Sequence, residues 1–235
     1  MIRMDLKKKL KYEILFWKRE NFTVKREVWD WIVSFLVAAA VYFILMPFVL
    51  GTSAPAVVVS SCSEAGHLNI GDVVINQGTP ISEVNAPEVN ISSLNYITPI
   101  FENNKVVAIN FSGNIVYRNE SSDIVTYLAV PSRAQIIHRV FAKVNYNGQT
   151  FLITQGDANP FPDQMWIQNG RGGWCFDDNN GLCISTLVNQ KMFLGKKIGP
   201  QIPIVGHVKL FFCDVMPFCD GHSNLGTGYE YKLWC

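Results

Sequence analysis

The sequence predicts a mainly β domain, built of antiparallel strands in a barrel-like or coiled sheet, behind one N-terminal transmembrane helix. Two observations predict this class. Residues 31–50 form an uncharged and largely apolar run. Residues 51–235 contain short segments rich in β-branched and aromatic residues, without a long segment that has the period of an amphipathic helix.

The apolar run reads WIVSFLVAAAVYFILMPFVL, and as a helix it would be about 30 Å long, which matches the hydrocarbon core of a bilayer. Lys and Arg are frequent before it and absent within it, so the positive-inside rule places the N-terminus in the cytoplasm. We therefore expect a cytoplasmic basic leader over 1–28, an uncleaved signal anchor over 29–50 and an extracytoplasmic domain over 51–235.

Charge and cysteine content narrow the class further. The formal net charge of +1 gives no support to a nucleic-acid partner. All six cysteines follow the apolar run, which indicates disulfides in an oxidising compartment; they are Cys62, Cys175, Cys183, Cys213, Cys219 and Cys235. Cys175 with Cys183 and Cys213 with Cys219 are spaced to close short loops, although the connectivity stays open. A zinc site from Cys213, Cys219 and His222 is disfavoured, and no metal or cofactor is expected.

The strands of the exterior domain are expected at seven apolar segments. Asn147-Gly148 separates two of them and indicates a tight hairpin. Residues 77–130 are expected to hold an irregular insertion, because Pro, Asn and Ser dominate its first part, and residues 164–184 a second loop. The predicted strands cover 56–60, 72–76, 105–111, 114–118, 136–146, 150–156 and 205–212.

Four residues suggest the chemistry of nucleophilic catalysis. Ser63 lies shortly after the membrane segment, His138 lies in an apolar strand, and Asp157 and Asp163 follow the hairpin. A neutral imidazole can accept a serine proton, and a carboxylate can orient that imidazole. A buried structural histidine and an Asx-turn at Asp157 are the plainer alternatives. The hairpin would bring residue 157 back beside His138.

Three segments together resemble the successive conserved boxes of type I signal peptidases of the archaeal and endoplasmic-reticulum type. They are SSCSEAGHLNIGDVV from residue 60, IIHRV from 136 and LITQGDANPFPD from 152. The resemblance covers about residues 28–76 and 131–212. It implies Ser63 as nucleophile, His138 as general base, Asp163 or else Asp157 as the orienting acid, and Ser61 as an oxyanion donor. Ser60 is a weaker alternative nucleophile, and His67 falls on a variable position.

The resemblance implies a membrane-anchored serine endopeptidase that cleaves signal peptides from exported preproteins at the outer membrane surface, with membrane lipid and the protein translocation channel as further partners. The first box departs from the family pattern, because Cys62 replaces Gly and Glu64-Ala65-Gly66 replaces Met-Glu-Pro. A Glu64 that pointed inward would raise the pKa of His138. A catalytically inactive relative that binds signal peptides, or an unrelated disulfide-bonded surface protein, are the alternatives.

Overall fold

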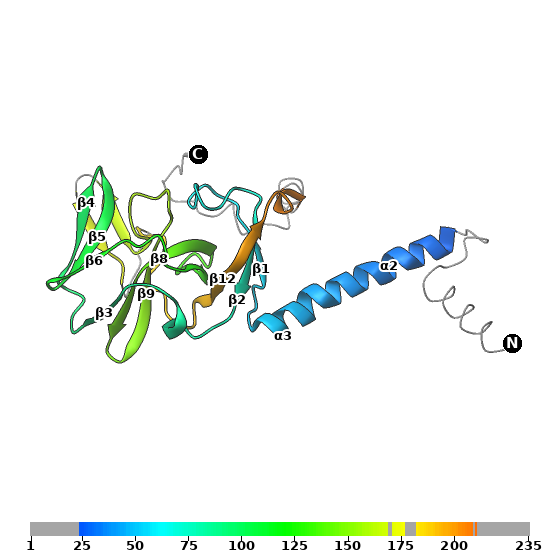
Figure 1. Ribbon diagram of the computed structural model, residues 1–235, viewed down its shortest axis with the longest axis horizontal. Helices are drawn as coiled ribbons and strands as arrows, with labels where there is room; N and C mark the ends of the chain where they lie inside the picture. The colour runs from blue at the N-terminus through cyan, green and yellow to red at the C-terminus, as the bar shows by residue number, and fades with distance from the viewer. Residues whose placement is uncertain (1–23, 169–170, 177–181, 209, 211–235) are drawn as a thin grey trace. The chain divides into compact units, whose positions relative to one another are not determined.

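The computed structural model describes residues 24–168, 171–176, 182–208 and 210. The chain divides into two units, residues 1–46 and 47–235, with an apolar helix in the first and a β domain in the second (Figure 1). Most of the basic leader, residues 1–23, lies outside the described residues, as do Cys213, Cys219, Cys235 and His222.

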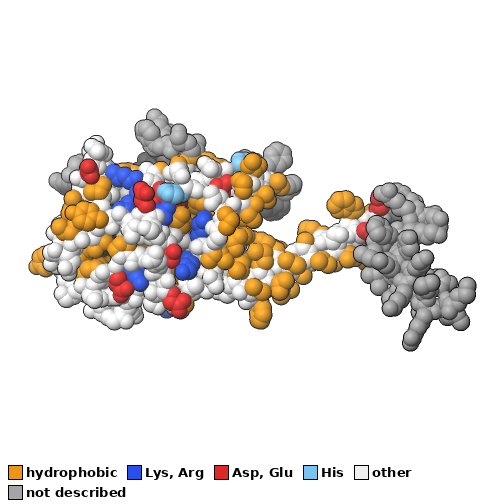
Figure 2. Space-filling model, in the orientation of Figure 1, with side chains coloured by type: hydrophobic (Ala, Val, Ile, Leu, Met, Phe, Trp, Pro, Cys, Tyr) orange, Lys and Arg blue, Asp and Glu red, His pale blue; other side chains and the backbone are white. Residues whose placement is uncertain are grey.

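The helix runs as α2 (Val24–Ala40), the π-helical turn η2 (Val41–Leu45) and α3 (Met46–Leu50). The π turn lies just before Pro47, whose ring has no N–H and would clash with the carbonyl four residues earlier in a regular helix. The helix over residues 26–50 contains an unburied apolar stretch of at least 18 residues, and it is the one helix among the described residues that is long and apolar enough to cross a membrane. Figure 2 shows hydrophobic side chains along its visible face. The prediction of a helix able to span a membrane is confirmed.

The β domain is centred on a seven-stranded sheet. Its strands are β1 (Ala56–Val58), β2 (Val73–Gln77), β3 (Glu88–Ile91), β7 (Ile124–Leu128), β8 (Gln135–Tyr146), β9 (Gln149–Gln155) and β12 (Phe193–Ile202). Their order is β1-β2-β12-β7-β8-β3, with β9 pairing the other edge of β8. The pairing of β3 with β8 is parallel and the other pairings of this sheet are antiparallel, so the predicted mainly β, antiparallel fold class is confirmed.

Two smaller sheets complete the described part of the domain. One has the order β4-β5-β6, from β4 (Ile97–Glu102), β5 (Lys105–Phe111) and β6 (Asn114–Tyr117). The other is the hairpin of β10 (Met165–Gln168) and β11 (Arg171–Trp174). A short 3-10 turn, η3 (Ile81–Glu83), precedes β3. The expected irregular insertion over 77–130 therefore contains regular strands, which pair with one another and with the main sheet.

The three-stranded sheet shares a hydrophobic core with the main sheet. Val106, Ile109 and Phe111 of β5 pack in one buried cluster with Phe141 of β8 and Ile153 of β9. This burial removes the apolar faces of both sheets from water, which is the main source of their stability. The insertion is thus part of one folded domain rather than a peripheral loop.

One sequence-based expectation fails at the end of the domain. Residues 205–208 were expected in a strand, yet they form a helical turn, in which Gly206 packs against Gly71 and donates its N–H to the Gly71 carbonyl at 2.9 Å. The closing strand is β12 instead, whose Gly and Lys content hides its β character. The hairpin prediction holds: Asn147 and Gly148 join β8 to β9, both with positive φ as a type I′ turn requires.

Candidate active site

Three neighbouring strands aim side chains at the carboxylate of Asp163. Its Oδ2 atom lies 2.6 Å from Nδ1 of His138 on β8 and accepts hydrogen bonds from Tyr127 of β7 at 2.7 Å and Thr154 of β9 at 2.6 Å. Opposed residues of antiparallel strands project from the same face, and the registers put these three side chains on one face of the sheet. All four residues are nearly or fully buried.

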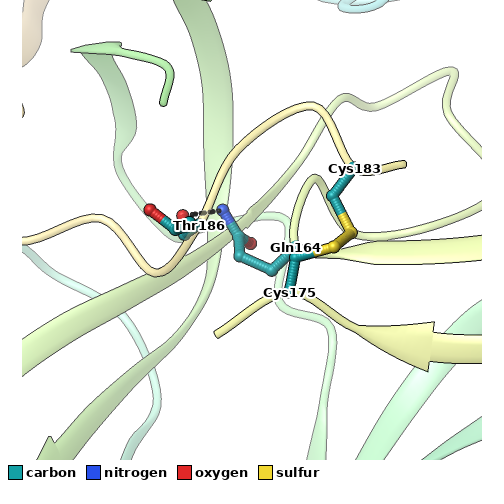
Figure 3. Close-up of a disulfide and its surroundings, with 4 residues drawn as sticks. All are labelled: Gln164, Cys175, Cys183 and Thr186. Atoms are coloured by element: carbon teal, nitrogen blue, oxygen red, sulfur yellow. Dashed lines mark hydrogen bonds between the residues drawn. A yellow bond between two sulfur atoms is a disulfide. The ribbon is translucent and has the colours of Figure 1, made fainter. Parts of the chain in front are cut away.

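The backbone around Asp163 is held on both sides. Its N–H donates to the carbonyl of Thr154 at 2.8 Å, and its own carbonyl accepts from Ser185 at 3.0 Å. The next residue, Gln164, bonds the Thr186 carbonyl beside the disulfide of Cys175 and Cys183, as Figure 3 shows. The sequence left the connectivity open, with this pair as one possibility; the structure joins Cys175 to Cys183, and this disulfide anchors the segment that flanks Asp163.

The proton affinity of His138 follows from this environment. Burial favours the neutral imidazole, but the charge and hydrogen bond of Asp163 outweigh it, with further contributions from Glu64 and Asp157, so the pKa of His138 is raised above 6.5. Because Nδ1 is held by Asp163, Nε2 is the nitrogen left for proton transfer, and it has no hydrogen-bond partner among the described residues. The arrangement suits a general base whose tautomer is set by a carboxylate.

Ser63 reaches the same face of the sheet from the loop between β1 and β2. Its carbonyl accepts the N–H of Ala158 at 2.8 Å, and a Cβ at Gly156 would lie only 2.5 Å from it. Arg139 pairs with Gln155, so extending the register by one residue sets Gly156 opposite His138. The missing Cβ of Gly156 and the His138 side chain then point to the same side. Ser63 and His138 therefore flank one spot beyond the end of β9.

The hydroxyls of Ser61 and Ser63 lie together, with 3.1 Å between their Oγ atoms. Residues 61 and 62 form a bend and residues 63–67 form turns, so the contact arises from a folded loop rather than from an extended segment. Within the described part of the chain, the hydroxyl of Ser63 bonds with Ser61 and not with His138. Catalytic hydrogen bonds are often long before substrate binds, and they tighten in the complex.

Glu64, the residue after Ser63, points inward. Its side chain is buried, with Oε1 accepting the backbone N–H of Arg139 at 3.2 Å, while Oε2 is buried without a hydrogen-bond partner among the described residues. Burial raises the pKa of Glu64 to about 8; nearby Asp157 adds to this rise, while His138 and Arg139 oppose it. The carboxyl therefore holds its proton at neutral pH.

Asp157 does not contact His138 but forms the centre of a separate ion-pair network. Arg139 donates to both of its carboxylate oxygens, at 2.9 Å and 2.8 Å, Arg118 pairs with Oδ1, and His67 lies 2.7 Å from Oδ2. Although burial opposes ionisation, these partners, Arg139 first, hold the pKa of Asp157 below its usual value. Of the two aspartates left open by the sequence, Asp163 is therefore the one placed on the imidazole.

Sequence reasoning missed Tyr127 and Thr154 as partners of Asp163, and Arg118 as a partner of Asp157. A tyrosine inside a wholly buried strand is a usable signal, because its hydroxyl must find a partner. Ser60 is exposed and lies just after β1, and His67 pairs with Asp157. Among the described residues, no group of three or more His, Cys, Asp or Glu side chains is arranged to hold a metal ion.

The chain matches no protein-family model, and no curated protein matches it.

Proposed function

We propose that this protein is a membrane-anchored serine endopeptidase of the type I signal peptidase kind, which cleaves signal peptides from exported preproteins at the outer membrane surface. In this proposal the N-terminus is cytoplasmic and the β domain extracytoplasmic, in agreement with the basic residues before the helix and with a disulfide in the domain. The observation that carries the proposal is the buried His138–Asp163 pair, with the backbone of Ser63 held against residues 156–158 next to it.

The proposed chemistry uses only these side chains. Ser63 Oγ attacks the scissile carbonyl carbon while Nε2 of His138 takes its proton, and Asp163 stabilises the imidazolium that forms. The imidazolium then protonates the leaving amine, and water hydrolyses the acyl-enzyme by the same base. The Ser63 N–H and the Ser61 hydroxyl supply the oxyanion donors, each worth roughly 3 kcal/mol in comparable sites.

The proposed substrate is an extended peptide. Strand β1 ends the seven-stranded sheet and pairs with β2 on one edge. An added strand would pair with the other edge through its main chain and lead the cleavage site toward Ser63, which follows β1 in the chain. Tethering by the apolar helix raises the local concentration of membrane-held substrate.

The test is cleavage of a radiolabelled preprotein by the full-length protein in vesicles. Ser63→Ala should abolish cleavage, Ser61→Ala should lower kcat by about 100- to 1,000-fold, and the neighbouring Ser60→Ala should leave it intact. Circular dichroism on each variant checks that the fold is retained. Wild-type-like cleavage by a folded Ser63→Ala variant would refute the proposal.

A second candidate is an inactive relative that binds signal peptides. It is favoured by the bond of Ser63 to Ser61 rather than to His138, and by the buried Glu64 beside the serine. Photo-crosslinking of a signal peptide to a wild-type protein that shows no cleavage would support this candidate instead.

A further inference from the structure

The three-stranded sheet β4-β5-β6 contacts the loop that carries Asp157 and Asp163 at four points. Lys105 Nζ at the start of β5 donates to the Asp157 carbonyl at 2.6 Å, and the Val106 N–H donates to the Pro160 carbonyl at 2.8 Å. Phe101 of β4 packs edge to face on Phe161, with ring centroids 6.3 Å apart. Arg118, directly after β6, pairs with the Asp157 carboxylate.

These contacts fix both the backbone and the charge of the loop. Two of them hold carbonyls of residues 157 and 160, one holds a ring at 161, and the ion pair neutralises a carboxylate that is itself mostly buried. Arg118 is also largely sheltered, with 15% of its side chain exposed against 7% for Asp157. Its position is set by the sheet, because its N–H donates to the Val107 carbonyl at 2.9 Å and continues the β5–β6 pairing.

We propose that the sheet β4-β5-β6 is the positioning element of the loop 156–163, with Arg118 and Lys105 as positioning residues for the serine–histidine site. This inference rests on the proposed function for its catalytic meaning. It gives the insertion a role in the site: a cationic clamp that holds Asp157 and, through the same short loop, sets Asp163 against His138.

The electrostatic consequence can be measured. His138 is faced by the acidic groups of Asp163, Glu64 and Asp157. The basic groups of Arg139, Arg118, Lys105 and His67 surround Asp157 and partly cancel its charge. Tyr127 adds a neutral donor to Asp163. Removing the charge of Arg118 leaves the negative charge less compensated, so His138 must hold its proton more tightly.

The experiment follows His138 by carbon-13 NMR of the histidine rings in the full chain, in micelles. Arg118→Gln should raise the pKa of His138 by roughly 0.3–1 unit and Lys105→Gln by less, whereas Arg118→Lys should restore the wild-type value. Arg133→Gln, which removes an exposed arginine outside these contacts, is the matched control and should leave the value unchanged. The His138→Gln variant assigns the resonance among the four histidines.

The pH profile of cleavage supplies the second readout. Arg118→Gln should lower kcat/KM by about 2- to 10-fold on the acid side and by less than about twofold on the plateau. An unchanged His138 titration in folded Arg118→Gln and Lys105→Gln would overturn the clamp, even if the wild type cleaves preproteins. A shifted titration in a protein that never cleaves would support the clamp and refute the proposed function. If Arg118→Gln does not fold, the pKa of His138 is compared between Lys105→Gln and Arg118→Lys instead.

Discussion

Nδ1 of His138 lies 2.6 Å from Oδ2 of Asp163, in a buried setting where Tyr127 and Thr154 bond the same carboxylate oxygen. The two residues are 25 apart in the chain and lie on different elements. A buried carboxylate that touches one imidazole stabilises its charged form and fixes its tautomer. This pair is therefore the structural basis for the base in the proposed mechanism.

Asp163 and Asp157 should behave differently when each is changed to asparagine. Asp163→Asn should lower kcat by about 10³- to 10⁴-fold with little change in KM, because an amide can donate to Nδ1 and hold the wrong tautomer. Asp157→Asn should act chiefly on stability, by about 1–3 kcal/mol, since it breaks the pairing with Arg139 and Arg118.

The measurement for this pair is preprotein cleavage together with thermal unfolding. Glu88→Gln, which alters an exposed carboxylate away from the site, is the control: it should leave cleavage unchanged and lower stability by no more than about 1 kcal/mol, the usual value of an exposed ion pair such as that of Glu88 with Lys143. A larger loss of kcat in Asp157→Asn than in Asp163→Asn would reverse the assignment of the two aspartates.

The pH dependence of cleavage should have its acid limb above pH 6.5, because the raised pKa of His138 keeps the base protonated to a higher pH than in a free histidine. Glu64 adds to that rise only when its carboxyl is ionised, and its own pKa of about 8 keeps it protonated over most of this range. Glu64→Gln is uncharged like the protonated carboxyl and still offers an oxygen to the Arg139 N–H, so it should leave the acid limb and the plateau of kcat/KM in place. An acid limb that moves to lower pH in this variant would show that Glu64 is ionised beside His138.

Through Glu64, stability should change with pH in the opposite direction to the change that an ordinary salt-bridged acid causes. Burial raises the pKa of Glu64 from 4.5 to about 8, so the native state holds a proton that the unfolded chain releases above about pH 4.5. The stability that the protonated Glu64 contributes is complete below that pH and is lost as the pH rises toward 8. Glu64→Gln has no such proton to hold and should be more stable than the wild type by roughly 1–3 kcal/mol at pH 7–8, with no advantage at pH 4.

Unfolding in denaturant at pH 4, 6 and 8 checks this prediction. Glu88→Gln is again the matched control, because the pKa of that exposed carboxyl is lowered by Asn145 and Lys143 and no advantage should grow with pH. Parallel pH dependences for Glu64→Gln and the wild type would contradict the buried, protonated state.

The disulfide of Cys175 and Cys183 should stabilise both the domain and the position of Asp163. Replacing both cysteines with serine should cost about 2–3 kcal/mol of unfolding free energy, the value expected for a loop of this length. Because the segment around Ser185 holds the Asp163 carbonyl, kcat should fall as well. The double variant measured against the wild type under oxidising conditions tests this, and unchanged stability would show that the hydrogen bonds alone hold the segment.

Much of the fold could be predicted from local patterns in the sequence. An uncharged apolar run predicts a helix wherever it lies, the alternation at 136–146 and 150–156 predicts two strands, and Asn147-Gly148 predicts their turn, because each signal acts within a few residues. The sequence also proposed Ser63, His138, Asp157 and Asp163 as site residues, from their types and positions and from the resemblance of three short segments.

Long-range contacts decided the rest. The choice between Asp157 and Asp163 depends on which carboxylate the fold buries beside His138, and the two lie only six residues apart. The inward turn of Glu64 depends on Arg139, 75 residues away, and the clamp of Arg118 on Asp157, 39 residues away. Side-chain partners at such separations follow from packing and desolvation in the assembled domain, which no local pattern of residue types encodes.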